Sequence, residues 1–242
     1  MCQSSIVVSH KCFVSDISFI SSKINMDKRN PSNGRFTHFI SVSEDAVVNI
    51  WDSRLVEKES LKNTPEFIWK PLLRMDLFKQ DGSGELGLSR ILVNRDSTIP
   101  NFWALSDEGD LILIDWSVKP PAGGDDGPKM VEYVRRTYNS MNENRPGLAL
   151  EQSPFFPELL LTVHNFNFAI WKTDLESYDK PIFVSAQTFG AHNTCGAWSP
   201  TRPGVIFITK TNGIDVWDFL DQSNKQSLTF NFATSPLMYC KF

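Results

Sequence analysis

Apolar and polar residues alternate in a recurring pattern along this chain. The pattern is clearest in FTHFISVSEDAVVNIWDSRL (residues 36–55), where an apolar stretch and a polar turn precede alternating residues that close on Trp51-Asp52. It returns in NFWALSDEGDLILIDWSV (101–118), ELLLTVHNFNFAIWKTDL (158–175) and GVIFITKTNGIDVWDFLD (204–221). Alternation with a period of two indicates strands, and turns rich in Gly, Asn, Asp and Ser indicate tight hairpins. We therefore predict four β-hairpins that belong to one internal repeat.

A bulky residue closes each hairpin, usually followed by Asp. The closing pairs are Trp51-Asp52, Ile114-Asp115, Trp171-Lys172 and Trp217-Asp218. We expect the bulky residue to pack between neighbouring sheets. Because Ile114 replaces Trp in the second unit and Lys172 replaces Asp in the third, the repeat signature is weaker there.

The last two units also share the turn that precedes the hairpin. Residues 153–157 and 199–203 both read S-P-x-x-P, and a Trp follows each Ser by 18 residues, so the units superpose without a gap at a period of 46. Two prolines fix φ in this turn, which gives the motif a structural reason. A proline-directed phosphorylation site at Ser153 or Ser199 is the less favoured alternative.

Stretches on either side of the hairpins indicate an inner and an outer strand. The inner candidates are 14–20, 87–93, 146–151 and 194–199, and the outer candidates are 66–77, 130–138 and 181–189. Four strands per unit are typical of a propeller blade. We predict a single all-β partial propeller over residues 1–242, with blades at about 10–78, 86–140, 146–189 and 190–232 and the first strand of a further blade at 235–242. The Pro/Gly/Asn/Asp-rich stretches 21–35 and 118–129 are predicted to be loops within blades.

Composition narrows the classes of partner. A chain of 242 residues that is 41% hydrophobic and 21% charged is typical of a soluble globular protein. Its net charge of −4 removes the bulk attraction for nucleic acid and anionic membrane, so proteins are the expected partners. No run is apolar enough for a membrane span, and the start lacks the features of a signal peptide, so we expect a cytoplasmic protein. Four dispersed cysteines without a C-x-x-C pair predict reduced thiols; they are Cys2, Cys12, Cys195 and Cys240.

Motifs for catalysis, cofactors or metals are not found. The stretch 82–87 reads G-x-G-x-x-G, but no strand leads into it and no helix is predicted after it, so a loop is favoured. Asp125-Asp126 lies in a Gly/Pro loop where two solvated carboxylates need no role. The basic residues are expected to be solvated, with a phosphate or an acidic protein surface as the less favoured alternative; they are Arg135, Arg136, Lys23, Lys28, Arg29 and Arg35. We therefore predict no enzyme, no cofactor and no metal.

Polar residues at the blade edge are expected to have a structural role. Asp45 lies in the first turn, six residues before Trp51, and His192 precedes the last inner strand, 25 residues before Trp217. A His before the first strand of a blade and an Asp in its turn are placed to hydrogen-bond along the blade edge. His10 is a candidate for this His in the first blade. A catalytic or ligating His192 is disfavoured because no second group is placed to complete a site.

Taken together, these strings resemble a known family. Trp-Asp hairpins at this spacing resemble WD40 repeats, and three longer strings resemble blades of dynein intermediate chains, particularly the axonemal inner-arm type. They are EFIWKPLLRMDL (66–77), QSPFFPELLLTVHNFNFAIWK (152–172) and CGAWSPTRPGVIFITKTNGIDVWDFLDQS (195–223). The resemblance runs from about Val14 to the end of the chain.

The resemblance implies a WD40-type propeller that acts as a non-catalytic scaffold. It would bind a dynein heavy chain and other dynein subunits, lie in the ciliary or flagellar axoneme, and support microtubule-based motility; the heavy chain hydrolyses the ATP. Phe155, Phe156 and Arg202 are candidate partner-binding residues because the S-P-x-x-P turns should be exposed. The alternatives are a general WD-repeat adaptor outside dynein and, less favoured, a propeller enzyme with its site in the central channel.

The sequence also departs from the family pattern. WD propellers usually close with six to eight blades, whereas four are visible here, so we expect an incomplete propeller with marginal stability or self-association. Family members carry a long N-terminal region that binds light chains, and it has no counterpart here. Weak or absent light-chain binding is therefore expected.

Overall fold

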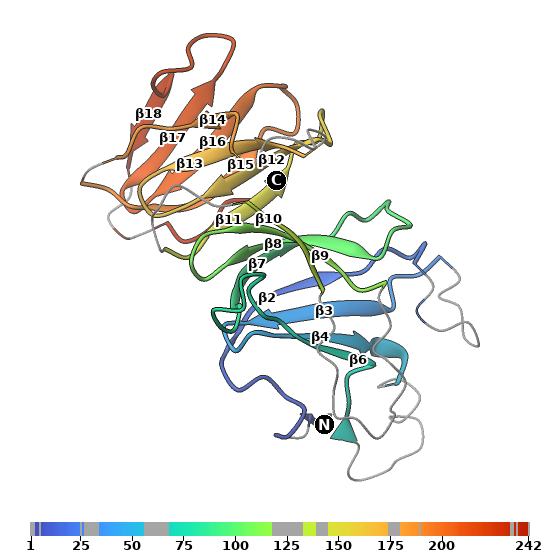
Figure 1. Ribbon diagram of the computed structural model, residues 1–242. Helices are drawn as coiled ribbons and strands as arrows, with labels where there is room; N and C mark the ends of the chain where they lie inside the picture. Colours follow the sequence, from blue (N-terminus) through green and yellow to red (C-terminus); the bar gives the residue numbers. More distant parts are fainter. Residues whose placement is uncertain are drawn as a thin grey trace. The chain divides into compact units, whose positions relative to one another are not determined.

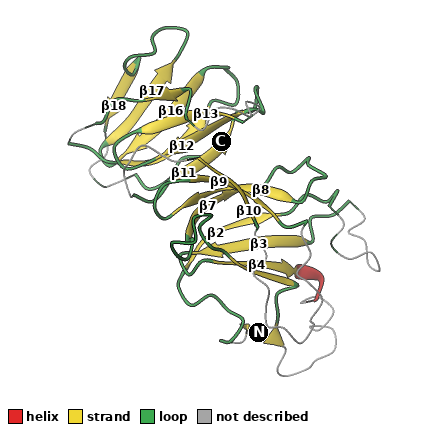
Figure 2. Cartoon of the chain, in the orientation of Figure 1, coloured by secondary structure: helices red, strands yellow, loops and turns green. Residues whose placement is uncertain are grey.

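The fold is built almost entirely from strands (Figures 1 and 2). A computed structural model describes residues 3–4, 6–24, 26, 34–55, 68–117, 133–138, 145–173, 180–188, 190–232, 235 and 237–241. Within these residues, the only helical segment is one short turn at 53–55. The prediction of an all-β protein is confirmed.

Four sheets of four strands follow one another along the chain. The first consists of β2 (Val14–Phe19), β3 (His38–Ser43), β4 (Val47–Asp52) and β6 (Leu73–Asp76), and the second of β7 (Leu88–Leu92), β8 (Asn101–Ser106), β9 (Leu111–Asp115) and β10 (Val134–Tyr138). The third consists of β11 (Ala149–Gln152), β12 (Leu159–Val163), β13 (Phe168–Lys172) and β14 (Phe183–Val184), and the fourth of β15 (Asn193–Trp198), β16 (Val205–Lys210), β17 (Gly213–Asp218) and β18 (Leu228–Asn231). These sheets are consistent with the blades of an incomplete propeller. All four predicted hairpins are present.

The outer strands differ from the prediction. The stretch 66–77 is not one strand: Pro71, which cannot donate a backbone hydrogen bond, separates β5 (Ile68–Trp69) from β6. β5 pairs in parallel with β1 (Gln3–Ser4), whereas β6 completes the first sheet. The predicted strand 181–189 is reduced to the two residues of β14, and the predicted strand 130–138 begins at Val134 among the described residues.

The segment predicted to begin a further blade, 235–242, forms no strand in its described part, residues 235 and 237–241. An inner strand of a blade is held by hydrogen bonds to the second strand of the same blade, and the described chain provides no such partner. The segment nevertheless lies beside the fourth sheet, because the Cys195 Sγ is 3.6 Å from the carbonyl oxygen of Cys240.

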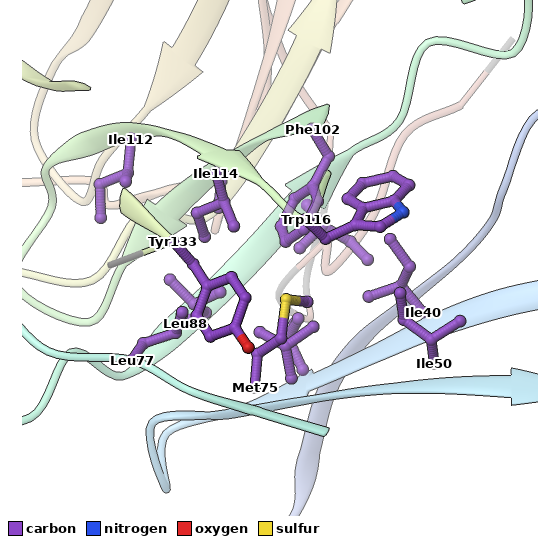
Figure 3. Close-up of a cluster of buried hydrophobic side chains, with 14 of the residues drawn as sticks. Ile40, Ile50, Met75, Leu77, Leu88, Phe102, Ile112, Ile114, Trp116 and Tyr133 are labelled. Atoms are coloured by element: carbon purple, nitrogen blue, oxygen red, sulfur yellow. The ribbon is translucent and has the colours of Figure 1, made fainter. Parts of the chain in front are cut away.

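The chain divides into two compact units, each with its own core. The first comprises residues 1–104 and 112–137, and the second comprises 105–111 and 138–242. In the first unit, β7 packs against β2 and β3, and the apolar side chains between the sheets are buried (Figure 3). In the second unit, β15 packs in the same way against β11 and β12 around a core that includes Phe168, Trp198 and Trp217.

The tip of the β8–β9 hairpin, residues 105–111, belongs to the second unit. The Arg145 backbone N–H donates to the carbonyl oxygen of Glu108 at 3.2 Å. Gly147 packs so closely on Leu105 that a Cβ at residue 147 would lie 2.3 Å from its Cδ1. This close approach requires glycine. The predicted inner strand 146–151 begins only at Ala149.

Candidate functional site

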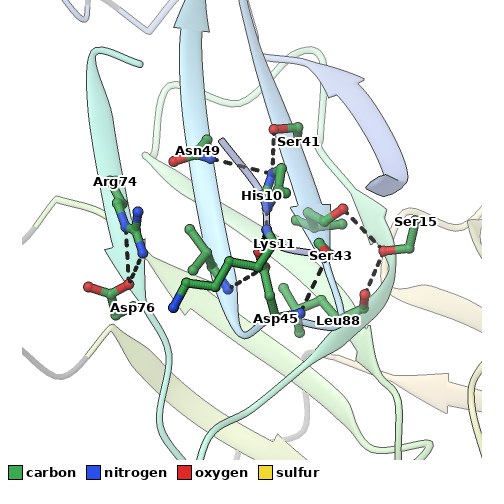
Figure 4. A network of polar contacts seen from close by, with 12 residues as sticks. His10, Lys11, Ser15, Ser41, Ser43, Asp45, Asn49, Arg74, Asp76 and Leu88 are labelled. Carbon is green, nitrogen blue, oxygen red and sulfur yellow. Dashed lines mark hydrogen bonds and ion pairs between the residues drawn. The ribbon is translucent and has the colours of Figure 1, made fainter. Parts of the chain in front are cut away.

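Four side chains of the first blade form a buried hydrogen-bonded set, which we call the first-blade network: His10, Ser41, Asp45 and Trp51. The His10 Nδ1 lies 3.1 Å from the Asp45 Oδ1, and its Nε2 lies 2.8 Å from the Ser41 Oγ (Figure 4). The Trp51 indole N–H donates to the same Ser41 oxygen at 2.8 Å. The network therefore ties the segment before β2 to the turn and to both strands of the first hairpin.

Backbone groups complete the shell around Asp45. The Lys11 N–H donates to its Oδ2 at 2.6 Å, and the Val47 N–H donates to its Oδ1 at 3.2 Å. Ala46 adopts φ 58°, a left-handed conformation that lets the hairpin reverse directly after the carboxylate. Burial alone would raise the pKa of Asp45, but the hydrogen bonds from Lys11 and His10 outweigh it and hold the pKa below 3.8.

This depressed pKa predicts acid sensitivity of the first blade. Because the unfolded carboxyl titrates near 3.8 and the folded one lower, the stabilisation is complete above pH 3.8 and is lost as the pH falls through the folded pKa. Asp45→Asn should cost about 1 kcal/mol at neutral pH. The melting temperature, measured by circular dichroism, should also fall less between neutral and strongly acidic pH in this variant than in the wild type.

The exposed pair of Lys23 and Asp96 provides the control, since an exposed pair contributes little. Asp96→Asn should leave both the melting temperature and its pH dependence unchanged. An Asp45→Asn chain that loses stability on acidification as steeply as the wild type would contradict the assignment.

The Asp that follows the closing residue pairs with an arginine in three blades. Asp52 accepts from the Arg54 guanidinium at 2.8 Å, Asp218 accepts from Arg202 at 2.9 Å, and Asp115 lies 3.4 Å from the Arg135 Nε. Burial would raise the pKa of Asp52, yet hydrogen bonds from Arg54 lower it below 3.8. No sequence pattern indicates these pairs, because each arginine has a different spacing from its aspartate along the chain.

The bulky closing residues are buried in all four blades. Trp171 is 2% exposed; its indole N–H donates to the Thr162 Oγ1 at 2.9 Å. Trp217 packs edge-on against Phe168, with ring centroids 4.9 Å apart. In the second blade Ile114 is fully buried. Sequence reasoning missed Trp116, which is also buried and packs against Phe102 with ring centroids 5.6 Å apart (Figure 3).

His192 does not make the predicted edge contact. Its side chain is exposed and packs on the Phe166 ring at 4.8 Å. The fourth turn, residues 211–213, carries no carboxylate that could pair with it. The next residue, Asn193, is buried instead and donates to the carbonyl oxygens of His164 and Asn167 at 3.0 and 3.3 Å.

The two S-P-x-x-P turns are closed by their serines. The Ser153 Oγ accepts from the backbone N–H groups of Phe155 and Phe156 at 3.3 and 3.2 Å. The Ser199 Oγ accepts in the same way from the next two non-proline residues, at 3.4 and 3.1 Å. Both serines are buried, so the geometry supports the turn interpretation over phosphorylation.

These turns present the candidate partner-binding residues at the surface. Phe155 and Phe156 are 39% and 44% exposed. The Arg202 side chain is 66% exposed although its guanidinium is paired with Asp218. Both turns connect an inner strand to the second strand of its sheet, so they occupy equivalent ends of the third and fourth sheets.

The described residues contain no group of three or more His, Cys, Asp or Glu side chains that could hold a metal ion. Burial lowers the pKa of His164 to about 4, against a hydrogen bond to the Arg145 backbone, so its imidazole is neutral at physiological pH. The G-x-G-x-x-G stretch is a turn that leads into β7, while Asp125, Asp126, Lys28 and Arg29 lie outside the described residues.

In the part of the chain that the structure describes, no helix has the length and apolar character needed to span a bilayer.

Most of the chain is similar to known proteins. A family model described as "Dynein axonemal intermediate chain 3 WD40 domain" matches residues 85–242. Human dynein axonemal intermediate chain 3 is 28% identical over 159 residues, covering 65% of this chain and 17% of that protein. Dynein axonemal intermediate chain 2 of Rattus norvegicus is 28% identical over 225 residues, covering 89% and 32%. Ciliary dynein intermediate chain 3 of Heliocidaris crassispina is 29% identical over 203 residues, covering 83% and 30%. The chain thus spans at most a third of the length of these relatives.

Proposed function

The chain belongs to the WD40-domain family of the dynein axonemal intermediate chains, and on that premise we propose that it is a non-catalytic scaffold subunit of an axonemal dynein complex. The observation that carries the proposal is the family match over residues 85–242, which contain every strand of the second, third and fourth sheets. The relatives are named as axonemal or ciliary dynein chains, which supports a role in the axoneme.

The finer proposal is that the chain binds a dynein heavy chain of the inner arm and so supports microtubule-based ciliary or flagellar motility. Exposed turns held on hydrogen-bonded sheets suit the binding of another protein. Because these turns are already ordered, they lose little conformational entropy when the partner binds.

We further propose that the two S-P-x-x-P turns contact the heavy chain. Phe155 and Phe156 are aromatic and partly exposed, and the Ser153 hydrogen bonds hold the backbone that carries them, which suits a role as interface anchors. Arg202 is fixed at the equivalent turn of the next sheet by Asp218. An arginine side chain already held by an ion pair loses little conformational entropy when a partner covers it.

Affinity purification from ciliated cells tests the proposal. The tagged full-length chain should enrich a dynein heavy chain, identified by mass spectrometry, and the identity of that heavy chain tests the inner-arm assignment. Phe155→Ala with Phe156→Ala should reduce the recovered heavy chain by about tenfold, since a buried interface anchor is worth more than 1 kcal/mol. Ile99→Ala, at a position that is 58% exposed in the first unit, is the matched control and should leave recovery unchanged.

The outcomes separate the two levels of the proposal. Failure to enrich any heavy chain with the wild-type protein would remove the scaffold function. Normal recovery with the double phenylalanine variant would remove the turns as the contact and leave the scaffold function standing.

A further inference from the structure

The outer strand of each four-stranded sheet has one edge that pairs with no other strand of the described chain. β6, β10, β14 and β18 each stand last in their sheets, so the far side of each carries backbone groups that no strand of the described chain pairs. Such an edge is a template for a strand of another molecule, and natural sheets protect it with charges, proline or short length. Whether each edge is protected can therefore be judged from its residues.

Three of the four edges are protected. β6 carries Arg74 and Asp76, whose side chains form an ion pair at 3.2 Å along the edge. β10 carries two adjacent arginines, Arg135 and Arg136. β14 is only two residues long and closely follows Pro181. A strand docking on any of these edges would meet charge, or too little backbone to pair.

The edge of β18 has none of these protections. The stretch SLTFNF (227–232) contains no charged residue and no proline, and all four residues of β18 are exposed. Leu228 and Phe230 are 55% and 52% exposed, and Phe232, which continues the alternation just beyond the strand, is 63% exposed. The strand is nevertheless well formed, because its four residues pair in register with β17.

The apolar side chains of this edge lie on one face. Thr229, between Leu228 and Phe230, donates from its Oγ1 to the buried Asp215 Oδ1 at 2.9 Å, which fixes its side chain on the inner face of the sheet. Because side chains alternate along a strand, Leu228 and Phe230 point to the opposite face, and position 232 follows them. The result is an uncharged edge with a row of three exposed apolar side chains.

We propose that β18 is a self-association edge, at which β18 of one copy pairs antiparallel with β18 of a second copy about a two-fold axis. Centred on Phe230, this register places Phe230 opposite Phe230 and Leu228 opposite Phe232, so every apolar residue of the row meets another. A register shifted by one residue in either direction leaves part of the row opposite polar or small residues. Since the stretch is uncharged, no like charges meet across the axis, and the edge is complementary to itself. This contact is independent of any dynein partner.

Analytical ultracentrifugation of the full 242-residue chain over a range of concentrations tests the proposal. The wild type should show a monomer–dimer equilibrium. Phe230→Lys should raise the dimer dissociation constant at least about tenfold, because two like charges then face each other across the pair. Phe230→Glu should do the same, and an equimolar mixture of the two variants should restore the dimer because Lys then faces Glu.

Leu220→Lys provides the matched control. Leu220 is 82% exposed in the turn after β17 of the same sheet, away from the edge, and its replacement should leave dimerisation unchanged. If circular dichroism shows that position 230 does not tolerate charge, a mixture of Leu228→Lys and Phe232→Glu chains tests the same register, since these positions face each other.

Three results would overturn the proposal. They are a wild-type chain that remains monomeric at every concentration, a Phe230→Lys chain that dimerises like the wild type, and folded variants whose mixture fails to restore the dimer.

Discussion

Trp171→Ala is expected to lower the free energy of unfolding by about 3–5 kcal/mol, the cost of removing a large aromatic side chain from a well-packed interior. Trp171 is 2% exposed, and its ring contacts Tyr138 edge-on at 5.7 Å. Removing it opens a cavity in the third sheet and leaves the buried Thr162 hydroxyl without its donor. Because small domains are stable by only about 5–15 kcal/mol, urea denaturation should show a large fall in the midpoint.

A second substitution separates packing from hydrogen bonding. Trp171→Phe keeps most of the apolar volume but removes the indole N–H, so it should cost clearly less than the alanine variant. Combining Trp171→Phe with Thr162→Val removes both partners of the hydrogen bond and should recover part of that cost. An alanine variant that unfolds within about 1 kcal/mol of the wild type would show that the third sheet tolerates the cavity.

The hairpins were predictable from the sequence because their determinants are local. Alternation from 36 to 55 marks two strands and the turn between them, and the return of the pattern at Trp171 and Trp217 marks the repeat. The S-P-x-x-P turns were predictable for the same reason, since each serine closes hydrogen bonds with residues two and three positions later. Local periodicity and turn chemistry carry this information without any knowledge of the tertiary structure.

The polar network of the first blade was only partly predictable. The sequence pattern indicates Asp45 and Trp51 and makes His10 a candidate. Nothing in the pattern distinguishes Ser41 from the other small polar residues of an alternating strand. Its role depends on receiving the Trp51 indole N–H from the neighbouring strand and contacting His10 from 31 residues earlier. His192 shows the reverse case: it occurs at the expected spacing, but its blade has no acidic residue in the turn, so the contact has no partner.

The outer strands were the least predictable elements. β14 has two residues and β18 has four, which is too short for a period to stand out from neighbouring loops. β5 joins β1, and this pairing depends on tertiary packing because the paired residues are 65 positions apart. The free edge of β18 is consequently a property that only the sheet order reveals.

Gly213→Ala is expected to detach β18 and to lower the free energy of unfolding by about 3 kcal/mol, at the upper end of the usual cost of overpacking. The sequence explains Gly213 as a turn residue, but the structure gives a stronger reason. A Cβ at residue 213 would lie 1.9 Å from the Phe230 carbonyl oxygen and 3.0 Å from the Asn231 Cα. Because these atoms belong to the backbone, no rotamer change relieves the clash, and β18 must move away from β17. Thermal melts and amide hydrogen exchange of residues 228–231 measure the effect.

Gly34→Ala is the control, since Gly34 has φ 77° and an added Cβ would contact no atom within 4 Å. It should cost only the backbone strain of a left-handed alanine, about 1 kcal/mol, and leave exchange at β18 unchanged. Displacement of β18 also breaks the hydrogen bond from Thr229 to Asp215, which leaves the buried carboxylate with Lys210 as its remaining partner. Slow exchange at β18 in the Gly213→Ala chain, equal to that of the wild type, would contradict the clash. If the edge of β18 mediates self-association, the same substitution should abolish the dimer while Gly34→Ala preserves it.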